Sequence, residues 1–591
     1  MRAIIKYWLA LLLIIPSIVT AIELQVNIKG TSSDLTKSIR TDLHLQQAIS
    51  EPKLTEVRIQ NLFALSNEQI HATLEAKGYY NSTIESNLTL KNGATPEQDT
   101  WVATFTITPG KTTKIHSVSV DIDGPGKDNA KLKKVLTTTK LIPGHVVIQA
   151  AYEDTKDELL AELNALGYLQ AEFTESVLAV NRDSYTADIT FKINTGVQYK
   201  FGKITFIDGV YPDDFLIRFA PFKAGDPYEL QKLIEFQSNL ESSDLFSKIR
   251  FDPIVDLNDP ANIVVPINVR LNLKLKNRYT GSVGYGTDTG FRGGLSWLHR
   301  RADTDGHKVF ARILASQVRS TAQLNYIIPG SQPATDRYVF GLLGQEEKFD
   351  ELYSRKAEIS GNKIMRRGKI ESMYGIWYFT ETFRIVHGDP NLNKKYLLPT
   401  AKWVWTDAKA TDEFEFGTRC DLRIRGGVQG IMSDTSVAEI EANAKKIFPM
   451  TEKMRLLLRT NLGAVASKEF SLLPPSLRFF TGGEESVRGY SYNSLGPLSD
   501  PGDPDSNTGG RYLFVASGEI EHKIYEQLSG VVFFDAGNTA LSMKMPLAFG
   551  TGVGVRYKTP VGKFRLDLAK PLNTVINKHW RVHVNFGTDF G

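Results

Sequence analysis

The sequence predicts three α+β modules of the order β-α-α-β-β, followed by a sixteen-stranded transmembrane antiparallel β-barrel. Two patterns indicate this fold class. The β-α-α-β-β order returns three times between residues 22 and 276, and apolar and polar residues then alternate in short segments from residue 277 to residue 591. A period of two residues is typical of strands. The helical stretches of the first two modules each end at a glycine, which is a typical helix stop signal.

The composition excludes several other classes of protein. The chain has 591 residues, a formal net charge of +4 and one cysteine, Cys420. So small a charge surplus argues against nucleic acid as a partner, and a lone cysteine excludes both a disulfide framework and a cysteine-based zinc site. No apolar run of about 20 residues occurs beyond the N-terminus, which excludes a helical membrane protein. A barrel is compatible with the mean hydropathy of −0.22, because its apolar and polar faces cancel.

Residues 1–21 have the pattern of an export signal. Arg2 and Lys6 precede an apolar stretch from Trp8 to Val19, and small residues occupy the −3 and −1 positions of a cleavage site after residue 21. The alternative is a signal anchor or a buried helix, for which the apolar stretch is short. We therefore expect the mature chain to be exported.

The three modules share landmarks that define their predicted bounds. In the first two, the second helix stops at Gly78 and at Gly167, each followed by tyrosine, whereas the third has Asp244 where the stopping glycine is replaced. In the first module, Ser66 with Gln69 three residues later predicts the N-terminal cap of that helix. The predicted modules are residues 22–110, 111–196 and 197–276.

The alternation after residue 277 predicts the barrel, over residues 277–591. For example, Leu456 and Leu458 fall on one side of a strand and Arg455 and Arg459 on the other. An even number of strands returns the chain to the side of the modules, so that the long connection 464–510 lies at the extracellular side. The alternative, a soluble β-sandwich, explains neither the charged inner faces nor the number of strands.

The most specific local motif lies in that long connection. Gly482-Gly483 is followed by Val487-Arg488-Gly489-Tyr490. This run resembles the loop-six signature of the outer-membrane protein translocation and assembly superfamily. The repeated modules ahead of it resemble that superfamily's polypeptide-transport-associated (POTRA) domains, which lie in the periplasm and offer sheet edges to partner or client chains. A simple spacer role for the modules is the alternative.

The resemblance implies a contact inside the barrel. In relatives, loop six folds back into the lumen, where its arginine meets an acidic residue on strand 12 and an aspartate on strand 13. Carried over, the match selects Arg488, Glu519 and Asp535, while Glu521 and Phe533 also face inward by alternation. A guanidinium can hold two carboxylates through its planar fork, so Arg488 is expected to pin the loop. The alternative is a solvated loop arginine.

Glycines mark the two strands expected to meet when the barrel closes. Gly281, Gly284 and Gly286 lie on the first strand and Gly587 lies on the last. Glycine weakens strand pairing, and in the resembling family this seam is held to be a lateral gate for client strands. Glycine is also common in barrel strands generally, so the residues alone do not establish a gate.

The resemblance implies a non-enzymatic assembly factor that promotes insertion and secretion of outer-membrane proteins such as autotransporters, with a TamB-type, inner-membrane-anchored periplasmic partner. The alternative is a two-partner secretion transporter, which exports one exoprotein through its pore. We find no metalloprotease, phosphate-loop or nucleophile-elbow motif, and we expect no cofactor. Whether the penultimate Phe590 serves as an assembly signal stays open.

Overall fold

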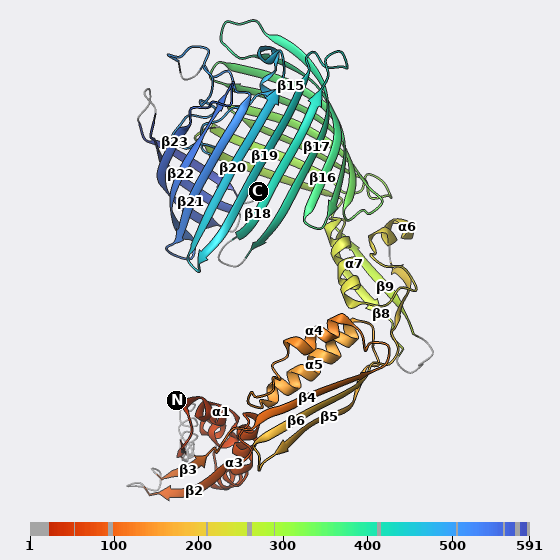
Figure 1. The fold of residues 1–591 in the computed structure, drawn as a ribbon, viewed down its shortest axis with the longest axis vertical. Helices are drawn as coiled ribbons and strands as arrows, with labels where there is room; N and C mark the ends of the chain where they lie inside the picture. Colours follow the sequence, from red (N-terminus) through yellow and green to blue (C-terminus); the bar gives the residue numbers. More distant parts are fainter. Residues whose placement is uncertain are drawn as a thin grey trace, which may run out of the picture. The chain divides into compact units, whose positions relative to one another are not determined.

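The structure is a computed structural model that describes residues 23–51, 54–92, 99–207, 211–256, 263–288, 290–410, 415–503, 506–559, 562–573 and 579–587. The predicted export signal 1–21 and the C-terminal Phe590-Gly591 lie outside the described residues. Three small sheets and one sixteen-stranded sheet make up the fold (Figure 1). The predicted fold class is therefore confirmed.

The first module packs its helices on a three-stranded sheet of order β1-β3-β2, in which β1 runs parallel to β3. Its core contains Ile59 and Leu74 from α3 and Phe105 from β3, all of them buried. The elements are β1 (Glu23–Lys29), α1 (Ser33–Asp42), α2 (His44–Gln47), α3 (Glu56–Ala76), β2 (Thr83–Lys91) and β3 (Thr100–Thr108).

The second and third modules repeat this arrangement, with sheet orders β4-β6-β5 and β7-β9-β8. The second contains β4 (Lys114–Asp123), α4 (Ala130–Thr138), α5 (Gln149–Ala165), β5 (Glu172–Asn181) and β6 (Thr186–Asn194). The third contains β7 (Lys200–Ile207), α6 (Asp213–Leu216), α7 (Leu230–Ser242), β8 (Phe246–Pro253) and β9 (Val264–Leu273).

One helix boundary differs from the sequence prediction. The helix predicted to be capped by Ser66 is α3, which begins at Glu56 with Thr55 as its cap. Ser66 is buried inside the helix, and its hydroxyl donates to the carbonyl of Leu62. The prediction was wrong because the apolar face of the helix continues through Leu62, so that burial overrides the capping preference of serine.

In each module, the second residue past the last helix has the left-handed backbone conformation. Gly78 and Gly167 both have φ of +88°, and Asp244 takes the same position in the third module with φ of +57°. The carbonyls of both glycines accept hydrogen bonds at 2.8 Å from the next module, from the amides of Thr113 and Tyr199. The left-handed conformation is unfavourable for aspartate relative to glycine, which suggests that the Asp244 side chain has a role of its own.

The barrel is a single sheet in which each strand from β10 to β25 pairs antiparallel with its chain neighbours. The strands are β10 (Asn277–Gly286), β11 (Gly290–His299), β12 (Lys308–Ser316), β13 (Arg319–Pro329), β14 (Asp336–Phe349), β15 (Leu352–Arg367), β16 (Ile370–Arg384), β17 (Leu392–Ala410), β18 (Glu415–Gly427), β19 (Val437–Thr451), β20 (Met454–Ala466), β21 (Tyr512–Lys523), β22 (Leu528–Ala540), β23 (Ala548–Thr559), β24 (Gly562–Pro571) and β25 (Arg581–Gly587).

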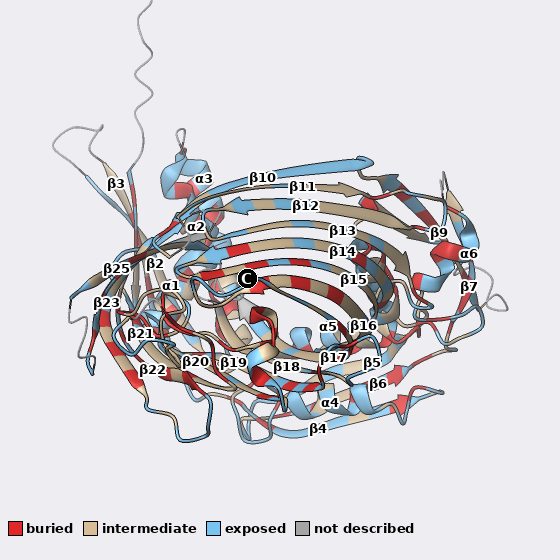
Figure 2. Ribbon diagram, turned by 90° about the horizontal axis from the view of Figure 1, so that it is seen from above, coloured by how far each residue is buried: buried red, intermediate tan, exposed pale blue. Residues whose placement is uncertain are grey.

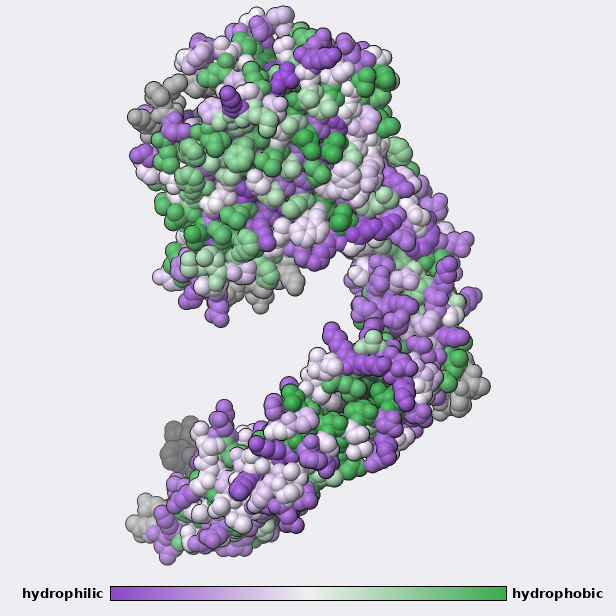
Figure 3. All heavy atoms as spheres, viewed as in Figure 1, coloured by the Kyte–Doolittle hydropathy of each residue, from purple (hydrophilic) through white to green (hydrophobic). Residues whose placement is uncertain are grey.

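The two faces of the barrel wall differ in polarity. On β22, Val532 and Phe534 are exposed on the outer face, whereas Phe533 and Asp535 are buried on the inner face. Hydrophobic residues gather over the outer wall in the space-filling view (Figure 3). Within the ranges given above, none of the helices is long and apolar enough to cross a membrane.

The connection between β20 and β21, residues 467–511, is called loop six below. Its first part forms two short 3₁₀ helices, Phe470–Leu472 and Pro475–Leu477. Leu473 and Leu477 are buried there against the inward-facing aromatic side chains Phe379 and Tyr396. Loop six therefore enters the barrel lumen and builds an apolar core inside it.

Candidate functional site

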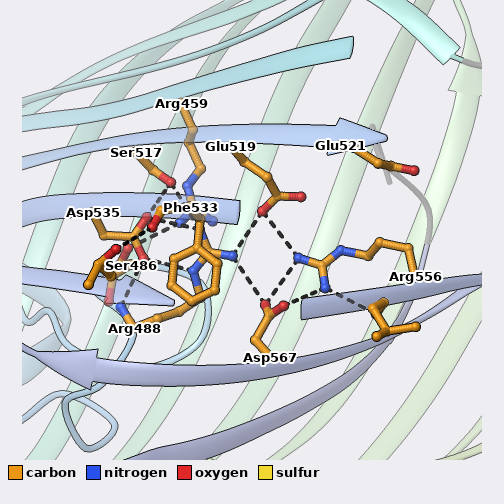
Figure 4. A network of polar contacts seen from close by, with 12 residues as sticks. Arg459, Ser486, Arg488, Ser517, Glu519, Glu521, Phe533, Asp535, Arg556 and Asp567 are labelled. Atoms are coloured by element: carbon orange, nitrogen blue, oxygen red, sulfur yellow. Dashed lines mark hydrogen bonds and ion pairs between the residues drawn. The ribbon is translucent and has the colours of Figure 1, made fainter. Parts of the chain in front are cut away.

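The candidate site is the contact between loop six and the inner wall of β21 to β24. Arg488 Nε donates to Asp535 Oδ2 at 2.7 Å and Arg488 Nη2 to Asp535 Oδ1 at 2.9 Å, and the Arg488 amide adds a third bond to Oδ2 at 3.1 Å (Figure 4). Asp535 is 0% exposed and Arg488 is 4% exposed. A bidentate, buried pair of this kind fixes both the position and the orientation of the guanidinium.

Two further carboxylates and a second arginine complete the network. Arg488 Nη1 donates to Glu519 Oε2 at 2.9 Å and to Asp567 Oδ2 at 3.1 Å. Arg556, on β23, donates to Glu519 Oε2 and Asp567 Oδ2 at 3.1 Å each. Because the two arginines share two carboxylates, the loop is tied to β21, β22, β23 and β24 through one connected set of charges.

The ring of Phe533 lies against the guanidinium of Arg488, with 3.4 Å between the guanidinium carbon and the ring centroid. Phe533 thus contacts the arginine through the face of its ring, while Asp535, two residues further along β22, binds it through the carboxylate.

The environment of Arg488 also affects its protonation. Burial by itself would lower the pKa of Arg488, but the hydrogen bonds and charge of Asp535, with Glu519 and Asp567, raise that pKa above its usual range. The loop arginine is therefore held in its charged form.

Gly489 and Tyr490 extend the contact toward the end of the barrel sheet. The Gly489 amide donates to Nε2 of His583 on β25 at 3.2 Å. With φ of +97°, Gly489 approaches the backbone so closely that a Cβ would lie 2.9 Å from the nitrogen of Pro571. The Tyr490 hydroxyl donates to the carbonyl of Phe549 at 3.2 Å. The Arg-Gly-Tyr run thus follows the wall from β22 to β25.

Glu521 belongs to a different pair. Arg455 Nη2 lies 2.6 Å from Glu521 Oε2, and both side chains are buried. Figure 4 shows Glu521 apart from the Arg488 contacts although Glu519 is only two residues away. Of the two glutamates that face inward, the structure therefore places Glu519 on Arg488 and Glu521 on Arg455.

Asp567 and Arg556 are not among the residues predicted from the sequence. Both alternate with apolar neighbours, in Leu566-Asp567-Leu568 and Val555-Arg556-Tyr557, and so carry the signal of an inward-facing charge. That alternation could have placed them in the lumen. Their level in the barrel depends on strand register and tilt, which the alternation leaves open.

A second anchor holds the entry of loop six, and no sequence motif predicts it. The Ser476 amide donates to Glu381 Oε1 at 3.3 Å, and its hydroxyl donates to the same carboxylate. The Ser476 carbonyl accepts from Arg425 Nη2 at 2.7 Å, and Arg425 pairs with Glu439 at 2.8 Å. Loop six is therefore attached to β16, β18 and β19 as well as to β21 through β25.

The glycines selected for the seam lie on strands that share no ladder. Gly281, Gly284 and Gly286 pair with Leu295, Arg292 and Gly290 of β11, and Gly587 pairs with Lys563 of β24. Among the described residues, no register joins β10 to β25. β10 is exposed along most of its length (Figure 2).

Across the residues that the structure describes, no group of three or more His, Cys, Asp or Glu is arranged to hold a metal ion.

Comparisons with known proteins agree with this architecture. Residues 391–590 match the Omp85 superfamily domain, and residues 25–109 match the family described as POTRA domain TamA domain 1. The chain is 22% identical to the outer membrane protein assembly factor BamA of Neisseria meningitidis serogroup B, over 86% of this chain and 70% of that protein. It is also 22% identical to BamA of Nitratidesulfovibrio vulgaris, over 81% of this chain and 62% of that protein, which is less than two thirds of that relative.

Among solved structures, BamA from Haemophilus ducreyi lacking POTRA domains 1–3 matches with a TM-score of 0.64 and 15% identity, over 80% of this chain and 99% of that chain. At this identity the likeness concerns the fold. The chain thus contains a match to the Omp85 superfamily domain within its barrel and a match to a POTRA domain in its first module. Its fold fits an outer-membrane barrel with POTRA domains in the periplasm.

Proposed function

We propose that this protein is a TamA-type, non-enzymatic assembly factor that promotes insertion and secretion of outer-membrane proteins, autotransporters among them. The observation that carries the proposal is the edge of β10. In the described residues β10 pairs with β11 alone. A strand edge without a ladder partner presents free N–H and C=O groups, which accept an extended client strand almost regardless of its sequence.

The pinned loop supplies the second part of the mechanism. Through Arg488 and Ser476, loop six is held on both sides of the lumen. A loop held there obstructs export through the barrel itself and so favours the seam as the exit for a client strand. The TamA-type match to residues 25–109 supports a TamB-type periplasmic protein as the partner of the modules.

The proposal is tested by comparing outer-membrane proteomes of cells with and without the protein. We expect the amounts of several barrel proteins and autotransporters to fall, with unrelated lipoproteins as the internal control. If barrel proteins and autotransporters are unchanged while one secreted exoprotein is lost, the protein is a two-partner secretion transporter instead. A pull-down with the full-length protein, which carries all three modules, tests for the TamB-type partner in the same cells.

A further inference from the structure

Loop six contacts both sides of the seam between β10 and β25. On the first side, Asp288 lies in the turn that joins β10 to β11, and its Oδ2 accepts a hydrogen bond of 2.7 Å from the Glu484 amide. A Cβ at Gly483 would lie 2.5 Å from the same carboxylate oxygen, so a side chain at that position would collide with Asp288. The loop backbone is therefore seated directly on the β10–β11 turn.

On the second side, His583 of β25 accepts the Gly489 amide through Nε2, at 3.2 Å. An accepting Nε2 carries no proton, so the neutral ring carries its proton on Nδ1. Nδ1 lies 3.7 Å from Asp288 Oδ1, and His583 is 2% exposed. Among the described residues Nδ1 has no hydrogen-bond partner, and Asp288 is the carboxylate it faces.

The two contacts come from one short piece of loop, since Glu484 and Gly489 flank the pinned Arg488 segment. Every other neighbouring pair of strands in the barrel is joined by a ladder of backbone hydrogen bonds. In the described residues β10 and β25 have no such ladder, so the loop contacts connect the two sides where the ladder is absent. A loop fixed by Arg488 to β22 can thus hold both edges at a set separation.

We propose that loop six is a latch across the seam, with Asp288 and His583 as the positioning residues on its two sides. The inference rests on the proposed function in that the seam is taken as the exit for client strands. The predicted structural change does not depend on that function. When the contact at Asp288 is released, the β10–β11 turn is freed from the loop and the distance between β10 and β25 increases. Displacement of loop six is then the step that opens the seam.

The test measures the distance across the seam in the purified full-length protein, reconstituted in phospholipid vesicles without clients. Spin labels are placed at Val283→Cys on β10 and Val582→Cys on β25, which are 91% and 50% exposed, in a Cys420→Ser background. We expect Asp288→Ala to give a longer and broader distance distribution than the parent. Asp288→Asn keeps an oxygen that accepts the Glu484 amide, and should restore most of the parent distribution.

Asp389→Ala is the matched control, because Asp389 is an exposed aspartate in the turn between β16 and β17. It should leave the seam distance unchanged. His583→Ala tests the latch from the other side, and it also serves if Asp288→Ala does not fold. An unchanged distance in the folded Asp288→Ala or His583→Ala protein overturns the latch. If a variant shows the longer distance in vesicles but assembles clients normally in cells, the result contradicts the proposed function and leaves the latch standing.

Discussion

The guanidinium of Arg488 is clamped between the ring of Phe533 and the carboxylate of Asp535, two residues that face inward from the same strand. The distance from the guanidinium carbon to the Phe533 ring centroid is 3.4 Å, and the shortest bond to Asp535 is 2.7 Å. Because residues i and i+2 of a strand share one face, β22 presents an aromatic platform and an acid at the spacing that one arginine needs. The position of loop six follows from this clamp.

Replacing the aromatic platform should loosen the loop without removing its ion pairs. A desolvated cation–π contact contributes about 2 kcal/mol, so Phe533→Leu should increase transient release of loop six by roughly 30-fold. Trypsin cleavage within loop six of the folded protein measures this release. Phe533→Tyr should behave like the parent, and Phe534→Leu, on the exposed outer face of the same strand, is the control. Equal cleavage in Phe533→Leu and Phe534→Leu would contradict a role for the ring.

The second anchor should act separately from the first. Ser476→Ala removes the hydroxyl that donates to the buried Glu381 carboxyl group, a hydrogen bond that contributes about 0.5–1.5 kcal/mol. We expect trypsin to cleave faster after Arg478, while the rate of cleavage after Arg488 stays unchanged. Since the two anchors share no residue, combining Ser476→Ala with Arg488→Ala should give additive effects. Strong non-additivity would show that the loop is held as one unit.

Asp244 should hold the third module to the start of the barrel. Its carboxylate lies 2.6 Å from Lys274 and 2.9 Å from Arg300, and these two cations outweigh burial and lower the pKa of Asp244. Asp244→Gly relieves the left-handed backbone but removes the carboxylate. Hydrogen exchange should therefore become faster at the turn between β11 and β12 in Asp244→Gly and in Asp244→Asn alike. Slower exchange in Asp244→Gly would mean that backbone strain, rather than charge, dominates at this residue.

Glu484 should make the seam contact sensitive to pH. Burial raises the pKa of Glu484 to about 7, and the charges of Asp288 and Glu485 add to this, while a hydrogen bond with Asn585 opposes it. A carboxyl whose folded pKa lies above its ordinary value of 4.5 stabilises the fold at low pH and loses that contribution as pH rises through 7. The midpoint of thermal unfolding should therefore be higher at pH 6 than at pH 8. Glu484→Gln should remove most of the difference, and a pH effect that persists in this variant would assign it elsewhere.

Much of the fold and part of the site could be predicted from the sequence, for identifiable physical reasons. Alternation placed Glu519, Phe533 and Asp535 on the inner face, because strand period depends only on local sequence. Alternation alone could not distinguish Glu519 from Glu521, since both face inward and differ only in their height along the strand. This height depends on the tilt and register of the whole barrel. For the same reason, the contact between Arg488 and Asp567 of β24 could not be predicted.

The anchor at Ser476 was beyond prediction for a related reason. Ser476 and Glu381 are 95 residues apart in the chain, and their contact depends on where loop six enters the lumen. A serine in a loop and a glutamate in a strand carry no local pattern that joins them. The cap predicted at Ser66 failed differently, because the local capping signal was real but burial of the continuing helix outweighed it.

The requirement for the pinned loop is tested most directly by the assembly of an autotransporter client in cells that carry Arg488→Ala. Removing one partner of a buried ion pair costs about 3–5 kcal/mol, because Asp535 would remain buried and charged, so loop six should leave the wall while the barrel stays folded. Lys468→Ala, an exposed residue of the same loop, is the matched control. We expect client assembly to fall strongly in Arg488→Ala alone, with normal heat-modifiability of its barrel. Full client assembly by a folded Arg488→Ala protein would contradict the claim that the pinned loop is required.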